Sequence, residues 1–185
     1  MKLSQLTLQE WRRFCAAAHA REGKKYGKRP YLYHLDRVEE ALVRFGFFET
    51  NFRRAAFGHD LIEDTRYKKK LLLSMGIDHE VLAGIWGVTD EPGATRQIRK
   101  HRTIGKIGRK LISLAVKLAD RIANVEENVR SANLKTFLKY KREHAELSTL
   151  RRRYSYNPRL NKMWAHLDWL FANGEQMILL QLMKG

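Results

Sequence analysis

The stretch Gly58-His59-Asp60-Leu61-Ile62-Glu63-Asp64-Thr65 combines one histidine and three carboxylates within six positions. An apolar run precedes this stretch, so it is predicted to form the C-terminal part of a buried helix. On a helix, His59 and Glu63 lie four positions apart, as do Asp60 and Asp64, which places all four on neighbouring faces. Buried charges are costly unless they are paired or bind a metal. The stretch therefore indicates a metal site with acid/base groups beside it. The alternative is a helix end with solvated acids and a structural histidine.

Length and composition indicate one globular domain. The chain has 185 residues and a hydrophobic content of 44%, enough for a sizeable core. No run of about 18 apolar residues is present, so we expect no membrane span. The segment Met1–Gln5 lacks the apolar core of a signal peptide. The single cysteine, Cys15, cannot form an internal disulfide, which fits a reducing cytoplasm.

The charge of the chain is strongly unbalanced. Lys and Arg number 36 against 20 Asp and Glu, which gives a net charge of +16. A field of that size attracts polyanions, so nucleic acid and phosphorylated small molecules are the expected partners. Simple solubility explains many individual lysines, but it does not readily explain so large an excess.

The hydrophobic pattern predicts an all-α bundle of about seven to nine helices. The capping box Thr7-Leu8-Gln9-Glu10 begins a helix that runs to about Arg21. A second helix is expected from about His34 to Phe45, and the central one ends with the stretch quoted above. Further helices are expected over residues 66–75, 78–86, 94–109, 113–124, 134–153 and 161–182.

Two basic segments are candidates for binding an anion. Residues 22–30 are rich in Gly and Lys and contain a Pro, and are predicted to form a loop that can clamp phosphates. Residues 94–109 are predicted to form a mobile helix able to lie over an anionic ligand. For both segments a solvated run of charge carries at least equal weight.

Asp120 is the next candidate for the metal site. It lies in the nearly continuous apolar segment 113–124, where Lys117, Asp120 and Asn124 share one helical face. A buried Asp needs a partner, and a metal held by the residues at 59 and 60 would supply one. His34, near the start of its helix, is a second candidate histidine ligand, although a histidine there is more often structural.

The order of these candidate residues along the chain resembles the sequence pattern of a known enzyme superfamily. The order His34, then His59-Asp60, then Asp120 is the pattern of HD-domain metal-dependent phosphohydrolases. Four segments resemble the RelA/SpoT-like small alarmone (ppGpp) hydrolases more closely than the superfamily at large. They are 59–65 (similar to HDxxEDT), 116–124 (similar to VKLADRxxN), 30–34 (similar to PYxxH) and 87–90, which contains GVT. The resemblance covers residues 8–145 and leaves 146–185 as a C-terminal helical extension of a single domain, 1–185.

The resemblance implies roles for individual residues. One divalent metal, manganese in this family, would be held by His34, His59, Asp60 and Asp120, a ligand set that suits Mn²⁺. Glu63 and Asp64 match the catalytic carboxylates of the family. The candidate substrate-binding residues are Lys24, Lys25, Lys28, Lys117, Asn124 and Tyr140.

The function that the resemblance implies is release of pyrophosphate from the 3′ position of (p)ppGpp. Glu127, three positions after Asn124, is acidic where the family usually has an uncharged residue near the nucleoside, so the base pocket is expected to differ. Another phosphorylated nucleotide such as NADPH is therefore an alternative substrate. A nucleic-acid-binding protein or nuclease on the same scaffold is a second alternative, and an interaction protein with a vestigial site is a third. The oligomeric state is left open.

Overall fold

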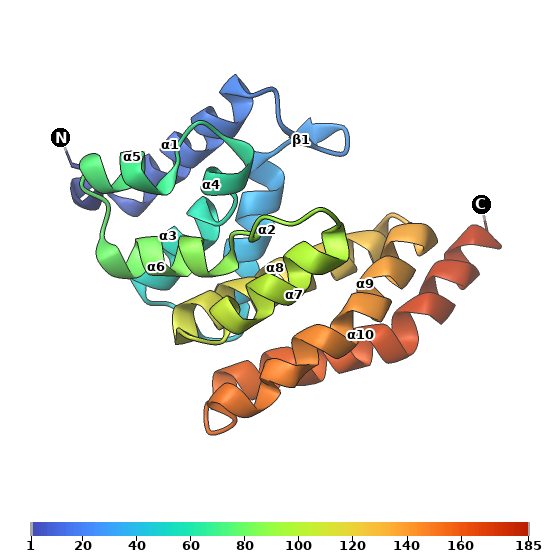
Figure 1. The fold of residues 1–185 in the computed structure, drawn as a ribbon. Coiled ribbons are helices and arrows are strands. Elements are labelled where there is room, and N and C mark those ends of the chain that lie inside the picture. The colour runs from blue at the N-terminus through green and yellow to red at the C-terminus, as the bar shows by residue number, and fades with distance from the viewer. Residues whose placement is uncertain (1, 185) are drawn as a thin grey trace.

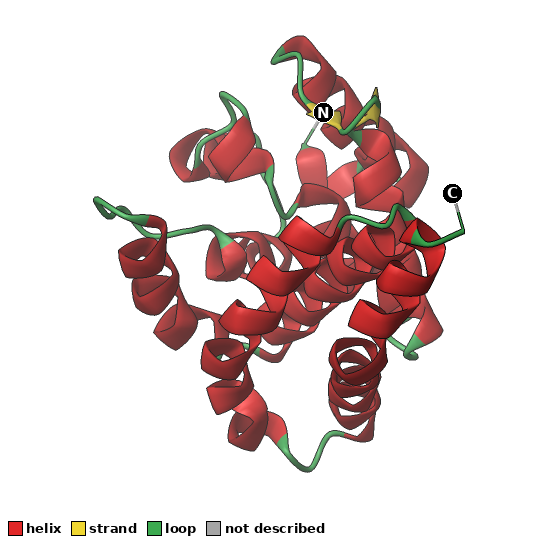
Figure 2. Ribbon diagram, turned by 90° about the vertical axis from the view of Figure 1, so that its right-hand side faces the viewer, coloured by secondary structure: helices red, strands yellow, loops and turns green. Residues whose placement is uncertain are grey.

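A computed structural model describes residues 2–184. Ten α-helices, two short 3-10 helices and one small hairpin account for most of this range (Figure 1). The α-helices are α1 Leu8–Arg21, α2 Leu32–Arg44, α3 Thr50–Gly58, α4 Leu61–Asp64, α5 Lys69–Ser74, α6 His79–Val88, α7 Arg96–Ile107, α8 Leu111–Arg130, α9 Leu134–Ser148 and α10 Pro158–Leu182. The remaining elements are η1 Leu3–Gln5, β1 Lys25–Tyr26, β2 Arg29–Pro30 and η2 Thr149–Tyr154. The predicted all-α fold class is confirmed, and Figure 2 shows how little of the described chain is strand.

Helix α8 is the centre of the bundle. It packs against α2, α3, α6, α7, α9 and α10. Leu114, Leu118 and Ile122 on α8 are fully buried, and each such side chain stabilises the fold by about 1.5–3 kcal/mol. Because neighbours surround it on nearly every side, α8 carries apolar residues on most of its faces. Any charged residue on its inner side must therefore find a partner within the protein.

A second cluster of buried apolar residues forms around α1. Trp11 and Cys15 of α1 are fully buried together with Leu61 and Ile85. The indole nitrogen of Trp11 also donates a hydrogen bond of 2.8 Å to the backbone oxygen of Arg54 in α3. This contact ties α1 to α3.

The prediction of one continuous helix through residue 65 is wrong. Helix α3 ends at Gly58, Asp60 adopts a turn conformation (φ −98°, ψ 1°), and α4 begins at Leu61. A Cβ atom at Gly58 would lie 2.6 Å from Cδ1 of Ile85 and 3.0 Å from Cζ2 of Trp11, so glycine permits the close packing there. Glycine also weakens a helix. The break turns the two residues after Gly58 toward α2 and α8.

Residues 22–30, predicted as a loop, contain a short antiparallel hairpin. Lys25 pairs with Pro30, and Tyr26 pairs with Arg29. Gly27, in the two-residue connection, has a φ of +60°, a conformation that favours glycine in tight hairpin turns. The hairpin gives Tyr26 a defined direction that a flexible loop would not provide.

Two other helices are shorter than predicted. The segment 66–75 is helical only over α5, and the predicted helix 134–153 ends at Ser148 and continues as η2. The C-terminal helix α10 packs against α8 and α9, so residues 158–182 belong to the same bundle. Within residues 2–184, no helix has the combination of length and apolar composition that crossing a membrane requires.

Candidate metal centre and active site

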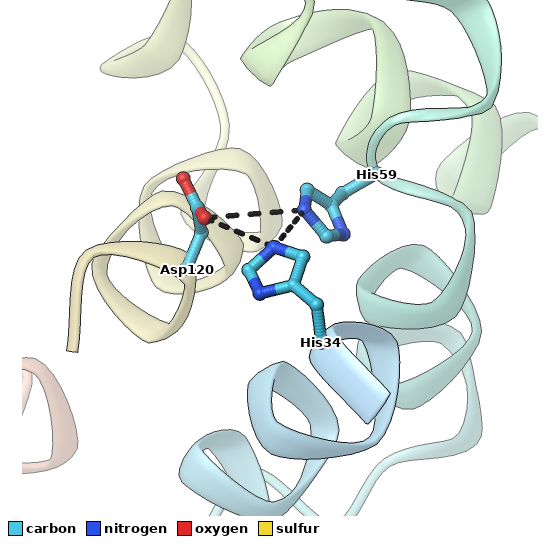
Figure 3. Close-up of side chains that lie close together, drawn as sticks. All are labelled: His34, His59 and Asp120. Atoms are coloured by element: carbon cyan, nitrogen blue, oxygen red, sulfur yellow. Dashed lines mark hydrogen bonds and ion pairs between the residues drawn. The ribbon is translucent and has the colours of Figure 1, made fainter. Parts of the chain in front are cut away.

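Three helices bring His34, His59 and Asp120 together (Figure 3). One ligand atom from each lies within 4.8 Å of the others. The Nε2 atoms of His34 and His59 are 3.2 Å apart. Oδ1 of Asp120 lies 3.4 Å from Nε2 of His34 and 4.0 Å from Nε2 of His59. The residues come from the start of α2, the end of α3 and the middle of α8, so the fold assembles a cluster from parts distant in sequence.

Asp60 reaches the same point. Its Oδ2 atom lies 2.9 Å from Nε2 of His59 and 3.9 Å from Nε2 of His34. The hydroxyl of Tyr31 donates a hydrogen bond to this oxygen. We call His34, His59, Asp60 and Asp120 the candidate metal centre. Tyr31 lies in the segment 30–34 but was not among the predicted site residues. Its contact with Asp60 joins the start of α2 to the turn after α3, and the sequence does not show that these two parts meet.

The candidate metal centre stabilises positive charge. Burial alone would lower the pKa of His59, but Asp60 and Asp120 raise it to about 9. Burial alone would raise the pKa of Asp60, but the facing imidazole of His59 lowers it below its ordinary value. Burial acts on Asp120 in the same way, and there Lys117 and the histidines lower the pKa. Both carboxylates are therefore ionised where a cation would be held.

The donor atoms fit a divalent metal. Nδ1 of His59 lies 2.7 Å from the backbone oxygen of Ala56. Nδ1 donates its proton to this oxygen, so Nε2 is the nitrogen that faces the centre and would bind a metal once the cation displaces its proton, as is usual for metal-binding histidines. Two imidazole nitrogens and two carboxylate oxygens suit first-row divalent cations such as Mn²⁺ and Zn²⁺. His34, His59, Asp60 and Asp120 could thus hold one ion.

Glu63 and Asp64 lie on α4, beside the candidate metal centre. Oε1 of Glu63 accepts a hydrogen bond from the backbone nitrogen of Asp90, and Oδ1 of Asp64 lies 2.7 Å from Nζ of Lys24. Partial loss of solvation and the nearby Asp60 raise the pKa of Glu63. A carboxyl group with a raised pKa is suited to proton transfer near neutral pH.

Most of the predicted substrate-binding residues lie around the candidate metal centre. Nζ of Lys117 is 2.9 Å from Oδ2 of Asp120, and the side-chain amide of Asn124 donates to Oδ1 of Asp120. Lys28, Asn124 and Tyr140 line a pocket of about 470 Å³. Asn124 thus connects Asp120 to the pocket that Lys28 and Tyr140 also line, whereas Lys117 lines a separate pocket with Lys100.

Lys25 is placed differently. It is exposed and lines another pocket, with Ala16 of α1 and Leu32 of α2. In a hairpin, neighbouring side chains point to opposite faces, so Lys25 and Tyr26 diverge. Lys25 therefore lies away from Tyr26 and beside Lys24 and Lys28, which line the same pocket.

Tyr26 covers the candidate metal centre. Its ring stacks on the imidazole of His34, with centroids 4.7 Å apart and an interplanar angle of 9°. Its hydroxyl donates a hydrogen bond of 3.0 Å to Oδ1 of Asn124. The sequence showed only that the basic segment contains an aromatic residue, and its partners depend on how the hairpin packs against α2 and α8.

Lys100 is a further cation that the sequence analysis did not single out. It belongs to α7, its side chain is 17% exposed, and its Nζ atom lies 3.7 Å from Oδ1 of Asp90. The nearby Lys117 and burial lower the pKa of Lys100 to about 8. Helix α7 therefore directs one of its cations toward the residues that surround Glu63 and Asp120.

The comparisons with known proteins identify the fold. No protein-family model matches the chain, and neither does any curated protein sequence. One similar solved structure is described as a metazoan ortholog of SpoT that hydrolyzes ppGpp and plays a role in starvation responses. It has a TM-score of 0.71 and 21% sequence identity, and the alignment covers 90% of this chain and 94% of that chain. The two proteins share a fold over nearly their whole lengths.

Proposed function

We propose that this chain is an HD-domain phosphohydrolase that removes pyrophosphate from the 3′ position of (p)ppGpp. The observation that carries the proposal is the convergence of His34, His59 and Asp120, with their ligand atoms within 4.8 Å of one another. The fold shared with a ppGpp hydrolase supports the choice of substrate. Manganese is the metal that the sequence resemblance implies, and a cytoplasmic location stays a prediction.

In this proposal the chain supplies ligands, proton transfer and counter-charge. When bound, a divalent cation lowers the pKa of a water molecule and offsets phosphate charge. Glu63 accepts the proton as the water oxygen bonds to the phosphorus next to the 3′ oxygen. The bond between that phosphorus and the 3′ oxygen breaks, and the proton held by Glu63 passes by way of Asp64 to the leaving 3′ oxygen. Lys24 and Lys117 offset the negative charge that develops.

A panel of phosphorylated nucleotides tests this function. We expect the purified protein to release pyrophosphate from ppGpp with Mn²⁺, and to stop when a chelator is added. Glu63→Gln should retain the metal and lose about 10²- to 10⁴-fold in turnover, because it removes an acid/base group and no candidate ligand. Hydrolysis that is insensitive to chelator, or a Glu63→Gln protein with full activity, would contradict the proposal.

A nuclease or nucleic-acid-binding role is the second candidate. It is favoured by the net charge of +16 and by exposed arginines on α7, such as Arg102. Binding to nucleic acid should then fall steeply as salt is raised. Hydrolysis of ppGpp that is unchanged by added RNA would weaken this candidate, and a protein that purifies without metal would favour a vestigial site instead.

A further inference from the structure

The pocket next to the candidate metal centre extends along the C-terminal half of α8. Asn124, Glu127 and Ser131 line it from α8, and Tyr26 of the hairpin lines its opposite side. Glu127 follows Asp120 by seven positions, which is about 10 Å along the helix axis. A nucleotide whose 3′ phosphate lies at Asp120 can therefore place its base near Glu127.

Several polar side chains of this pocket are already used by the backbone. The hydroxyl of Ser131 donates to the backbone oxygen of Glu127 at 2.7 Å. The amide of Asn128 donates to the backbone oxygen of Asn124 at 2.7 Å. Asn133 accepts from the backbone nitrogen of Thr136 as a helix cap. Among the described residues that line the pocket, Glu127 is the one with an acidic side chain.

The carboxylate of Glu127 is held in place and ionised. Nη2 of Arg130 lies 2.5 Å from its Oε1, and the hydroxyl of Tyr33 donates to its Oε2 at 3.0 Å. Burial alone would raise the pKa of Glu127, but these two partners lower it. An ionised carboxylate accepts hydrogen bonds and donates none. Arg130 contacts both oxygens of Glu127, but its side chain is 52% exposed, so a ligand can replace this contact while Tyr33 keeps the carboxylate in place.

We propose that Glu127 is the specificity-determining residue that selects guanine over adenine in the bound nucleotide. This inference rests on the proposed function. Guanine presents two adjacent donors, N1–H and the N2 amino group, and both can donate to one carboxylate. Adenine presents an acceptor, N1, beside its single amino donor. An adenine in the same place would therefore set the N1 lone pair against a carboxylate oxygen, and the unpaired polar groups disfavour binding.

The inference separates two substrates that the sequence left as alternatives. Both ppGpp and NADPH carry a phosphate on the ribose, but the ribose that carries it bears guanine in ppGpp and adenine in NADPH. Glu127 distinguishes the two bases by their N1 edge, which projects farthest from the phosphate. The same residue should therefore make adenine nucleotides poor substrates even when their phosphates match those of ppGpp.

The test compares ppGpp with ppApp as substrates for the wild-type protein, Glu127→Gln and Glu126→Gln. We expect wild type to favour ppGpp in kcat/KM by about 10- to 100-fold, the discrimination typical of a paired contact to a base. Glu127→Gln should remove or reverse that ratio, because its amide offers one donor and one acceptor to adenine. Glu126→Gln is the matched control, since Glu126 binds Arg44 and His166 away from the pocket. It should leave the ratio unchanged.

A binding measurement keeps this inference separate from the proposed reaction. Calorimetric affinities of GDP and ADP for the same three proteins report base selection without turnover. A wild-type preference for GDP that disappears in Glu127→Gln supports the role of Glu127 even if ppGpp is not hydrolysed. Equal base preferences in wild type and a folded, metal-containing Glu127→Gln protein would overturn it. Absence of hydrolysis alongside intact base selection would instead overturn the proposed function.

Discussion

The candidate metal centre and helix α7 are both dense in charge, but they are organised differently. In the centre, imidazoles and carboxylates face one another inside the bundle. From Pro92 to Ala119 the sequence contains no acidic residue, yet Lys100 and Lys106 of α7 pair with Asp90 and Glu91. The charged groups of the candidate metal centre pair with one another, whereas the cations of α7 pair with acidic residues outside that helix. The centre should therefore be intolerant of change, while α7 should tolerate change on its outer face.

The largest expected effect is at Asp120. Asp120→Ala removes a candidate ligand and leaves Lys117 buried without its partner, and breaking a buried pair typically costs about 3–5 kcal/mol. We expect metal content, measured by elemental analysis, to fall from about one ion per chain to background, and hydrolysis to fall to the level seen with chelator. Asp168→Ala is the control, because Asp168 pairs with Arg151 at the surface. Retention of metal and activity by Asp120→Ala would show that the two regions do not differ as described.

A smaller loss is expected at Tyr31. Tyr31→Phe keeps the ring that stacks on His19 and removes the hydroxyl that donates to Asp60. A residue that hydrogen-bonds to a metal ligand typically contributes about 10- to 100-fold to metal affinity or activity. Competition with a metal-binding dye measures the affinity, and thermal unfolding checks the fold. An unchanged metal affinity would mean that Asp60 is positioned by its backbone alone.

Substitution of one glycine in each region compares how an added methyl group changes the free energy of unfolding there. Gly58→Ala places a methyl group against Ile85 and Trp11, and overpacking of this kind typically costs about 1–3 kcal/mol. Gly105→Ala on α7 meets no described atom within 4 Å and should stabilise the helix by up to about 1 kcal/mol. Urea unfolding of both proteins measures the difference. Equal free energies of unfolding for the two variants would contradict the tight packing at the end of α3.

The helices and their order could be predicted because they depend on local spacing, whereas the grouping of His34, His59, Asp60 and Asp120 was expected from the family resemblance. His59 and Asp60 are adjacent, and the residues around Asp120 repeat at helical intervals. Other features depend on contacts between distant segments. The break after Gly58 depends on Ile85, the divergence of Lys25 from Tyr26 depends on the hairpin, and the Tyr31 contact depends on how α2 meets the end of α3. Local periodicity carries none of that information.

Lys100 differs from the outer cations of α7 because it loses its positive charge near pH 8, and this change should affect substrate binding. Its pKa is about 8, lowered by Lys117 and burial, so it is mostly positive below pH 8 and mostly neutral above. The loss of one positive charge that faces an anion weakens binding by about tenfold. KM for ppGpp should therefore rise as pH increases through 8, while Lys100→Arg should show no such rise. The same rise in Lys100→Arg would assign the titration to another group.

The smallest effects are expected on the outer face of α7. Arg102 of α7 and Arg109, two positions beyond its end, are exposed, so the double change Arg102→Gln/Arg109→Gln should alter the free energy of unfolding by less than about 0.5 kcal/mol. KM for ppGpp should stay the same, because Lys100, not these arginines, is directed inward. If the outer face binds nucleic acid, the salt dependence of RNA binding should weaken by about one ion for each phosphate contact that is lost. Lys135→Gln/Lys162→Gln removes the same charge from α9 and α10 and serves as the control. A higher KM for ppGpp in the arginine variant alone would mean that the outer face of α7 also attracts the substrate, and the distinction between its two faces would then fail.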